Sequence, residues 1–232
     1  MEIDQPIASW TFKKYQEEYI IIPTIAFVIA AITAAYSPTL PVLIILFIVT
    51  AIWILVLYFF RDPDRDVIDE PGLVIGPCEG TVADITRVQE EQYLHAEAIR
   101  VGVFLSIFNV HVQRAPLAGE IIFVKHQPGK FFPAFSPQAS TENEYIAMSI
   151  KTNYGIVLVK QISGILARRC VNFTQPGDQV LTGQRFGLIK FGSRVELFLP
   201  PNAEILVSVG DTVTGGLTKM AQLPELRNDH EK

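Results

Sequence analysis

Hydrophobic residues are distributed very unevenly along the chain. From Tyr19 to Phe60, 42 consecutive residues contain no Asp, Glu, Lys or Arg, about twice the roughly 20 residues that one helix needs to cross a bilayer. Ser37 and Pro38 interrupt this stretch and favour a turn. The pattern therefore predicts a transmembrane helical hairpin, with helices at about 19–36 and 40–60, after a polar lead-in at 1–18.

The charges that flank the hydrophobic stretch predict its orientation. Lys13 and Lys14 precede it, Arg61 and Arg65 follow it, and the short connecting loop is uncharged. The positive-inside rule then places both ends of the hairpin in the cytoplasm, so the rest of the chain is expected on the cytoplasmic face of the inner cell membrane. A cleaved signal peptide would be shorter, whereas a buried hairpin of a soluble core stays open as the alternative.

Beyond a charged linker at 61–70, the pattern changes to short β segments separated by Gly, Pro and Asn. No amphipathic helix of useful length is present, so residues 71–232 are expected to form a mainly β domain with few short helices. The expected strands are Gly80–Ile85, Ala98–Leu105, Gly119–Val124, Ala147–Lys151, Gly155–Ile162, Arg185–Ile189 and Val195–Leu199.

A seven-residue pattern, G-D-x-V-x-x-G, occurs twice in this domain, at Gly177–Gly183 and Gly210–Gly216. It is typical of the turns of lipoyl- and biotinyl-type barrel-sandwich domains. The glycines are expected at positive φ, and the aspartates are expected to cap the turns. The repeat therefore predicts a barrel-sandwich fold.

Composition excludes several classes of function. The net charge is −5 and no basic run is present, which argues against nucleic acid as a partner. Cys78 and Cys170 are isolated in the sequence, so neither a disulfide framework nor a metal site is expected.

The pair Gly192-Ser193 lies between two apolar runs and has the residue types needed for backbone self-cleavage. A serine hydroxyl can attack the preceding carbonyl, and glycine leaves that carbonyl sterically open. Elimination from the resulting ester and hydrolysis would convert the serine into a pyruvoyl group. The structural alternative for a Gly-Ser pair is an ordinary turn or bulge.

Attack by serine needs a base, and the chain has four histidines. His95 and His230 lie in polar segments, and His126 borders a loop. His111 instead stands at the end of an apolar run, before Pro116. A structural role is the alternative for such a histidine.

Six ordered sequence blocks together resemble the short, membrane-anchored form of the phosphatidylserine decarboxylase family, whose members are self-processing pyruvoyl enzymes. A set of blocks at compatible spacing is far more specific than any one of them. The blocks are Phe59–Pro63, Gly76–Gly80, Asn109–Pro116, Pro128–Phe131 with Glu142–Glu144, Gln161–Arg169 and Arg185–Arg194.

The resemblance implies roles for individual residues. Ser193 matches the pyruvoyl precursor, with cleavage after Gly192 into a β chain, 1–192, and an α chain, 193–232. His111 matches the base of self-cleavage. Its acidic partner in the family lies in a Pro-Ala-Asp-Gly motif, which here contains Glu79 in place of the aspartate. Asp84 is the alternative carboxylate, although it faces away from Glu79 unless a bulge intervenes.

The resemblance also implies conversion of the phospholipid phosphatidylserine to phosphatidylethanolamine, with the pyruvoyl carbonyl as electron sink. The proton donor to the decarboxylated carbon is then His111 or His126, and we favour His111. The position three residues before the base, a histidine in long forms, is Phe108 here.

Contacts with the membrane-bound substrate are expected from aromatic and basic side chains, for each of which core packing or a solvated charge is the structural alternative. The aromatic candidates are Phe131, Phe132 and Phe135, and the phosphate candidates are Lys130, Arg114 and Arg168. The alternative class is a non-enzymatic, membrane-tethered lipoyl-like adaptor. The sequence leaves open whether the chain forms a homo-oligomer.

Overall fold

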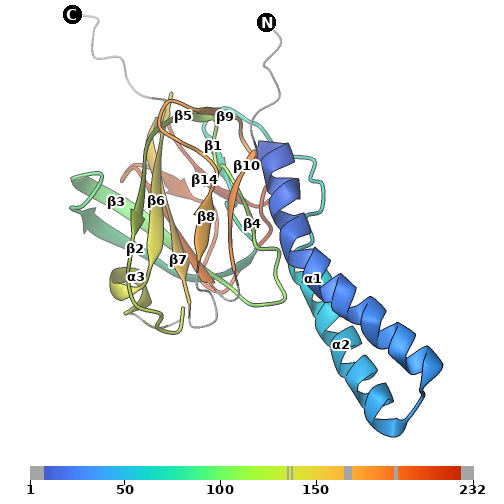
Figure 1. Ribbon diagram of the computed structural model, residues 1–232. Helices are drawn as coiled ribbons and strands as arrows, with labels where there is room; N and C mark the ends of the chain where they lie inside the picture. Colours follow the sequence, from blue (N-terminus) through green and yellow to red (C-terminus); the bar gives the residue numbers. More distant parts are fainter. Residues whose placement is uncertain (1–7, 135, 137, 165–168, 191–192, 226–232) are drawn as a thin grey trace, which may run out of the picture. The chain divides into compact units, whose positions relative to one another are not determined.

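The computed structural model describes residues 8–134, 136, 138–164, 169–190 and 193–225. It divides the chain into two units, one ending at Pro63 and the other beginning at Asp64. The first unit is a helical hairpin and the second is mainly β, so the fold class predicted from the sequence is confirmed (Figure 1).

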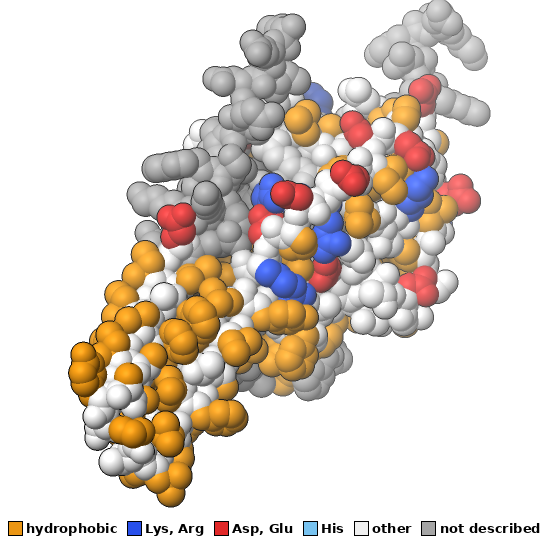
Figure 2. All heavy atoms as spheres, turned by 90° about the vertical axis from the view of Figure 1, so that its right-hand side faces the viewer, with side chains coloured by type: hydrophobic (Ala, Val, Ile, Leu, Met, Phe, Trp, Pro, Cys, Tyr) orange, Lys and Arg blue, Asp and Glu red, His pale blue; other side chains and the backbone are white. Residues whose placement is uncertain are grey.

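The first unit consists of helices α1, Ala8–Tyr36, and α2, Leu40–Phe59. Segments Tyr19–Tyr36 and Leu40–Phe59 have mean hydropathies of 2.1 and 3.1, and by length and composition both could cross a membrane. Figure 2 shows hydrophobic side chains along this hairpin. Helix α1 begins within the segment for which a polar lead-in was expected.

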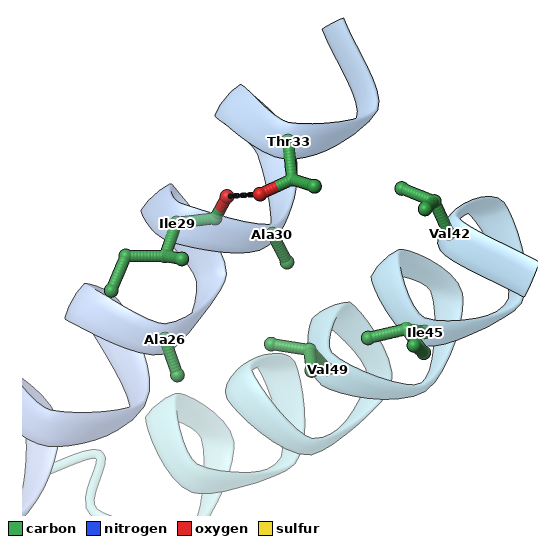
Figure 3. A pocket seen from close by; sticks show the side chains of 7 residues that line it. All are labelled: Ala26, Ile29, Ala30, Thr33, Val42, Ile45 and Val49. Carbon is green, nitrogen blue, oxygen red and sulfur yellow. Dashed lines mark hydrogen bonds between the residues drawn. The ribbon is translucent and has the colours of Figure 1, made fainter. Parts of the chain in front are cut away.

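The two helices pack through an aromatic pair and a hydrogen bond. The rings of Phe27 and Trp53 stack with centroids 4.4 Å apart, and Trp53 Nε1 donates to Thr24 Oγ1 at 3.0 Å. Farther along, an apolar cavity of about 360 Å³ separates the helices (Figure 3). The Thr33 hydroxyl at this cavity donates to the carbonyl of Ile29 at 2.9 Å. The lining offers no titratable group for chemistry; it consists of Ala26, Ile29, Ala30, Thr33, Val42, Ile45 and Val49.

The second unit is built on an eight-stranded sheet in the order β13-β2-β3-β11-β7-β6-β5-β9. Its pairings are antiparallel, and alternate side chains of the strands fill a core that contains Val82, Val103, Val195 and Leu197. The strands are β2 Gly80–Glu90, β3 Ala96–Leu105, β5 Gly119–Gln127, β6 Tyr145–Thr152, β7 Gly155–Ser163, β9 Gln179–Val180, β11 Ser193–Leu199 and β13 Thr212–Val213.

Two three-stranded sheets, β1-β14-β12 and β4-β10-β8, complete the β domain. The one helix among its described residues is the short α3, Ala139–Glu142. The remaining strands are β1 Leu73–Ile75, β4 Val112–Arg114, β8 Cys170–Asn172, β10 Arg185–Ile189, β12 Glu204–Ile205 and β14 Lys219–Gln222.

The two copies of the G-D-x-V-x-x-G repeat lie at opposite edges of the eight-stranded sheet. One contains β9, which pairs with β5, and the other contains β13, which pairs with β2. The first glycines have φ of +96° at Gly177 and +97° at Gly210. Asp178 and Asp211 each accept a backbone N–H three residues earlier, at 2.8 Å. The expected turn geometry is therefore confirmed in both copies.

Candidate active site

Ser193 is the first residue of β11, and it is fully buried between two neighbouring strands. It pairs with Leu105 at the end of β3 and with Ser163 at the end of β7. Its Oγ is buried and has no hydrogen-bond partner among the described residues. A buried hydroxyl without a partner is costly in a purely structural role. Gly192 lies outside the described residues.

Strand register brings His111 into the same corner of the domain as Ser193. The chain leaves β3 at Leu105, opposite Ser193, and enters β4 at Val112, opposite Leu188 of β10. The segment that carries His111, residues 106–111, therefore begins next to the pair formed by Leu105 and Ser193 and ends next to the pair formed by Val112 and Leu188. A turn holds it there: Asn109 Oδ1 accepts hydrogen bonds from the backbone N–H and the hydroxyl of Ser106, both at 2.8 Å.

The hydrogen bond of the His111 ring fixes its tautomer. Nδ1 lies 2.9 Å from the carbonyl oxygen of Asn109. Because a carbonyl only accepts, Nδ1 carries the proton, and the neutral ring has its lone pair on Nε2. Nε2 is buried, and the whole residue is 2% exposed. When the ring is neutral, this arrangement leaves Nε2 as a basic nitrogen away from bulk water.

Glu79, directly before β2, is fixed at both oxygens. Oε2 accepts the backbone N–H of Val110 at 2.9 Å, and Oε1 accepts a hydrogen bond from the Arg65 guanidinium. The carboxylate therefore holds the residue adjacent to His111. The hydrogen bond predicted between His111 and Glu79 itself stays a prediction.

Asp84 belongs to a charged cluster on β2, β3 and β11. It forms ion pairs with Arg194 and, at 3.2 Å, with Arg100, and Arg194 Nε donates to Glu196 at 2.9 Å. Burial lowers the pKa of Arg194, but the charges of Glu196 and Asp84 raise it by more, so its pKa lies above the ordinary value. A bulge does interrupt β2 between Val82 and Asp84.

The side chains of Arg194 and Glu196 share one face of β11, whereas Ser193 points to the other face. The Arg194 cluster therefore engages Asp84 on the face of the strand opposite to Ser193. This placement distinguishes Asp84 from Glu79, whose carboxylate is bound to the segment of His111.

A cavity of about 460 Å³ opens where β5, β6 and β8 each contribute part of the wall. His126 Nε2 lies 3.0 Å from Glu144 Oε1 at its wall. The same Glu144 accepts, at its backbone carbonyl, the N–H and the hydroxyl of Ser163, the β7 partner of Ser193. The lining residues are His126, Pro128, Gly129, Phe131, Glu144, Ile146, Arg169 and Cys170.

The aromatic candidates are only partly at the cavity. Phe131 lines it and is 42% exposed. The backbone of Phe132 is bound by the buried amide of Asn143, which also donates to the carbonyl of Ser163 at 2.7 Å. Phe135 lies outside the described residues.

The basic candidates are dispersed. Lys130 forms an exposed ion pair with Glu142 at 2.7 Å. Arg114 is buried on β4 and donates to the carbonyl of Gly183 at 3.2 Å, and Arg168 lies outside the described residues. Among the described residues, Arg169 contributes a guanidinium to the cavity, and sequence reasoning did not single it out.

Sequence reasoning also missed Arg65, Asn143 and Ser163 as parts of this region. Asn143 and Ser163 belong to sequence blocks that carry the family resemblance, which was the available signal. Arg65 was considered only for its charge next to the membrane, and nothing in its local pattern indicates a bond to Glu79.

Both cysteines are buried thiols. Burial, and then the charge of Glu79, raise the pKa of Cys78 well above its ordinary value. Burial is also the largest cause for Cys170, followed by the charge of Glu144, and its hydrogen bond to the Ile146 backbone only partly offsets the rise in pKa. Both side chains are therefore protonated, poor nucleophiles at neutral pH.

We expect both thiols of the folded protein to resist alkylation by iodoacetamide at pH 8, at least about 100-fold relative to the denatured chain, because the thiolate is the reacting form. In the unfolded chain the two thiols ionise above about pH 8.5, whereas in the folded protein they stay protonated. The free energy of unfolding should therefore fall as the pH rises past that value. Mass spectrometry of labelled peptides measures the rates. Rapid labelling of Cys170 in the folded protein would contradict its burial.

Comparison with known proteins identifies sequence relatives. Residues 53–221 match the family model described as phosphatidylserine decarboxylase. Proteins named phosphatidylserine decarboxylase proenzyme are 43% identical over 177 residues in Carboxydothermus hydrogenoformans, covering 76% of this chain and 83% of the relative, and 43% identical over 179 residues in Parabacteroides distasonis, covering 76% and 81%. A relative of the same name from Anaplasma phagocytophilum is 40% identical over 205 residues, with 88% of each chain covered.

Proposed function

Because this chain belongs to the phosphatidylserine decarboxylase family, we propose that it converts phosphatidylserine to phosphatidylethanolamine with a pyruvoyl group that it makes from Ser193 by self-cleavage. The observation that carries this proposal is the buried Oγ of Ser193, which has no hydrogen-bond partner among the described residues and lies at the corner of the domain where His111 also lies. Family membership disfavours the non-enzymatic adaptor, because the relatives are named as proenzymes.

In the proposed self-cleavage, His111 Nε2 takes the hydroxyl proton of Ser193 as its Oγ attacks the carbonyl carbon of Gly192. The C–N bond then breaks, the amide nitrogen gains the proton, and Gly192 is left as an ester on Oγ. Loss of the Ser193 α-proton expels the Gly192 carboxylate and leaves dehydroalanine. Addition of water and release of ammonia complete the pyruvoyl group.

When formed, this group supplies a ketone that binds the substrate amine and accepts the electrons released with CO₂. The buried surroundings of Ser193 would keep bulk water away from the substrate carbon that loses CO₂. His111 is our preferred proton donor, with His126 as the alternative. His126 reaches the cavity in partnership with Glu144.

The substrate headgroup is proposed to occupy the 460 Å³ cavity. Its wall combines Phe131, which suits contact with acyl chains, with Arg169 and His126, which suit an anionic phosphate. Glu144 connects this cavity to Ser193 through Ser163.

Self-cleavage at Gly192–Ser193 would leave the two products associated. The α chain would contain β11, β12, β13 and β14, and β11 is hydrogen-bonded to β3 and β7 on both of its edges. Strands β13 and β14 also pair with β2 and β1 of the β chain. The new terminus at Ser193 would therefore stay fixed in the sheet.

We expect purified wild-type protein to give two fragments under denaturing conditions, residues 1–192 and residues 193–232, which copurify under native conditions. The smaller fragment should carry a carbonyl-bearing, blocked N-terminus. Ser193→Ala should abolish both cleavage and decarboxylation, since it removes the attacking oxygen. His111→Ala should leave mostly full-length chain. Gel analysis and intact mass report these outcomes, and an active enzyme that remains a single chain would contradict the mechanism.

The carboxylate assignment predicts different effects at two positions. Glu79→Gln should slow cleavage by on the order of 100-fold, because a neutral amide no longer holds the His111 segment as a charged acceptor. Asp84→Asn should change the cleavage rate by less than about threefold, since Asp84 pairs with Arg194 on the other face of β11. Time courses of fragment formation measure both. The reverse ranking would assign the partner role to Asp84.

The proposed topology places both ends of the hairpin, and the β domain, on the cytoplasmic side of the cell membrane. Protease added to intact spheroplasts should therefore leave residues 61–232 undigested, whereas the same protease should digest them after the membrane is permeabilised with detergent. Immunoblotting of the β domain gives the readout. Digestion of the β domain before permeabilisation would contradict the proposed orientation and place this domain outside the cytoplasm.

A further inference from the structure

The segment from Asp64 onward, which follows the helical hairpin, is bound to the β domain through Arg65 and Val67. Arg65 donates to Glu79 Oε1, and both side chains are largely buried, at 19% and 15% exposed. Two residues later, Val67 packs so closely on Gly183 that a Cβ there would lie 2.4 Å from Val67 Cγ2. Residues 64–67 are therefore part of the folded domain.

The partner of Arg65 is the carboxylate nearest to the proposed base. One oxygen of Glu79 accepts the Val110 N–H at 2.9 Å and the other accepts the Arg65 guanidinium. The adjacent Asn109 carbonyl accepts the ring N–H of His111. A continuous chain of contacts thus runs from Arg65 through Glu79 and the 109–110 backbone to the imidazole.

We propose that Arg65 is a positioning residue for self-cleavage, which acts on His111 through Glu79. This inference rests on the proposed function. A charged hydrogen bond from a planar guanidinium adds to the bond from the Val110 N–H and restrains the side-chain torsions of the carboxylate. The linker next to the membrane anchor then belongs to the processing machinery.

A second ion pair in the same region provides a matched control. Lys219 on β14 bonds Glu70 at 2.9 Å, and both side chains are about half exposed. This pair also fastens the segment after the hairpin to the β domain, but it does not involve Glu79. If Arg65 merely anchored the linker, loss of either pair would have a comparable effect.

The experiment measures the rate at which newly synthesised full-length chain in detergent is cleaved. Thermal unfolding gives the fraction of each variant that is folded, and the rate is divided by that fraction. Arg65→Gln should slow cleavage about tenfold, since a charge-assisted hydrogen bond is lost. The Arg65→Lys variant should cleave at an intermediate rate, because lysine restores the positive charge but lacks the planar guanidinium with its paired N–H groups. Lys219→Gln should cleave at the wild-type rate.

A double-mutant cycle tests whether Arg65 acts through Glu79. The double variant with Glu79→Gln and Arg65→Gln should cleave no more slowly than the Glu79→Gln variant. The Glu79→Gln substitution has already removed the carboxylate through which Arg65 is proposed to act. If Arg65→Gln fails to fold, the same cycle with Arg65→Lys decides. Fully additive effects would overturn the inference.

Three further outcomes separate the inference from the function on which it rests. If wild-type protein does not cleave, the proposed function fails and this inference fails with it. If wild type cleaves and Arg65→Gln cleaves at the same rate, only the role of Arg65 is overturned. Equal slowing by Arg65→Gln and Lys219→Gln would also overturn it, by reducing Arg65 to a linker anchor.

Discussion

The pairing of β11 on both of its edges is the constraint on which the rest of the β domain depends. Every residue of this strand from Ser193 to Leu199 pairs with β3, and those from Ser193 to Phe198 also pair with β7. A strand held on both sides has little freedom to shift in register, because a one-residue slip would move its core side chains to the opposite face. The position of the Ser193 hydroxyl is thereby set by the sheet.

The alternation of side chains on β11 separates two tasks. Val195, Leu197 and Leu199 share the face of Ser193 and are buried in the main core. Arg194 and Glu196 take the other face, where Arg194 binds both Glu196 and Asp84. Removing one member of such a buried set leaves an uncompensated charge, which is costly. The strand is therefore fixed by apolar packing on one face and by ion pairs on the other.

The sequence predicted the elements of this fold better than the contacts among them. The uncharged stretch and the alternating apolar runs gave both helices and the long strands, because those patterns follow directly from burial on one face. The repeat Gly177–Gly183 and Gly210–Gly216 gave turn geometry correctly, since positive φ has few residue solutions. The predicted strand ends differed by a few residues; β2, for example, continues to Glu90, where its carboxylate caps the following turn.

For the candidate site as well, individual residues could be predicted from the sequence, whereas the contacts among them could not. Ser193 and His111 could be proposed from the sequence because the proposed chemistry requires a hydroxyl directly after a glycine and a base in an apolar setting. The bond from Arg65 to Glu79 could not, because the two residues are 14 positions apart and only the course of the linker over the domain joins them. The cavity was missed for a similar reason, since β5, β6 and β8 each contribute part of its wall.

These long-range contacts accommodate Glu79 at a position where the sequence resemblance implies an aspartate. The longer side chain of Glu79 reaches the Val110 N–H with one oxygen, while its other oxygen binds a cation from outside the strand. Arg65 supplies that cation from the linker. The additional methylene is thus accommodated by an additional partner, so the orientation of the carboxylate depends on the segment that follows the helical hairpin as well as on the strands of the β domain.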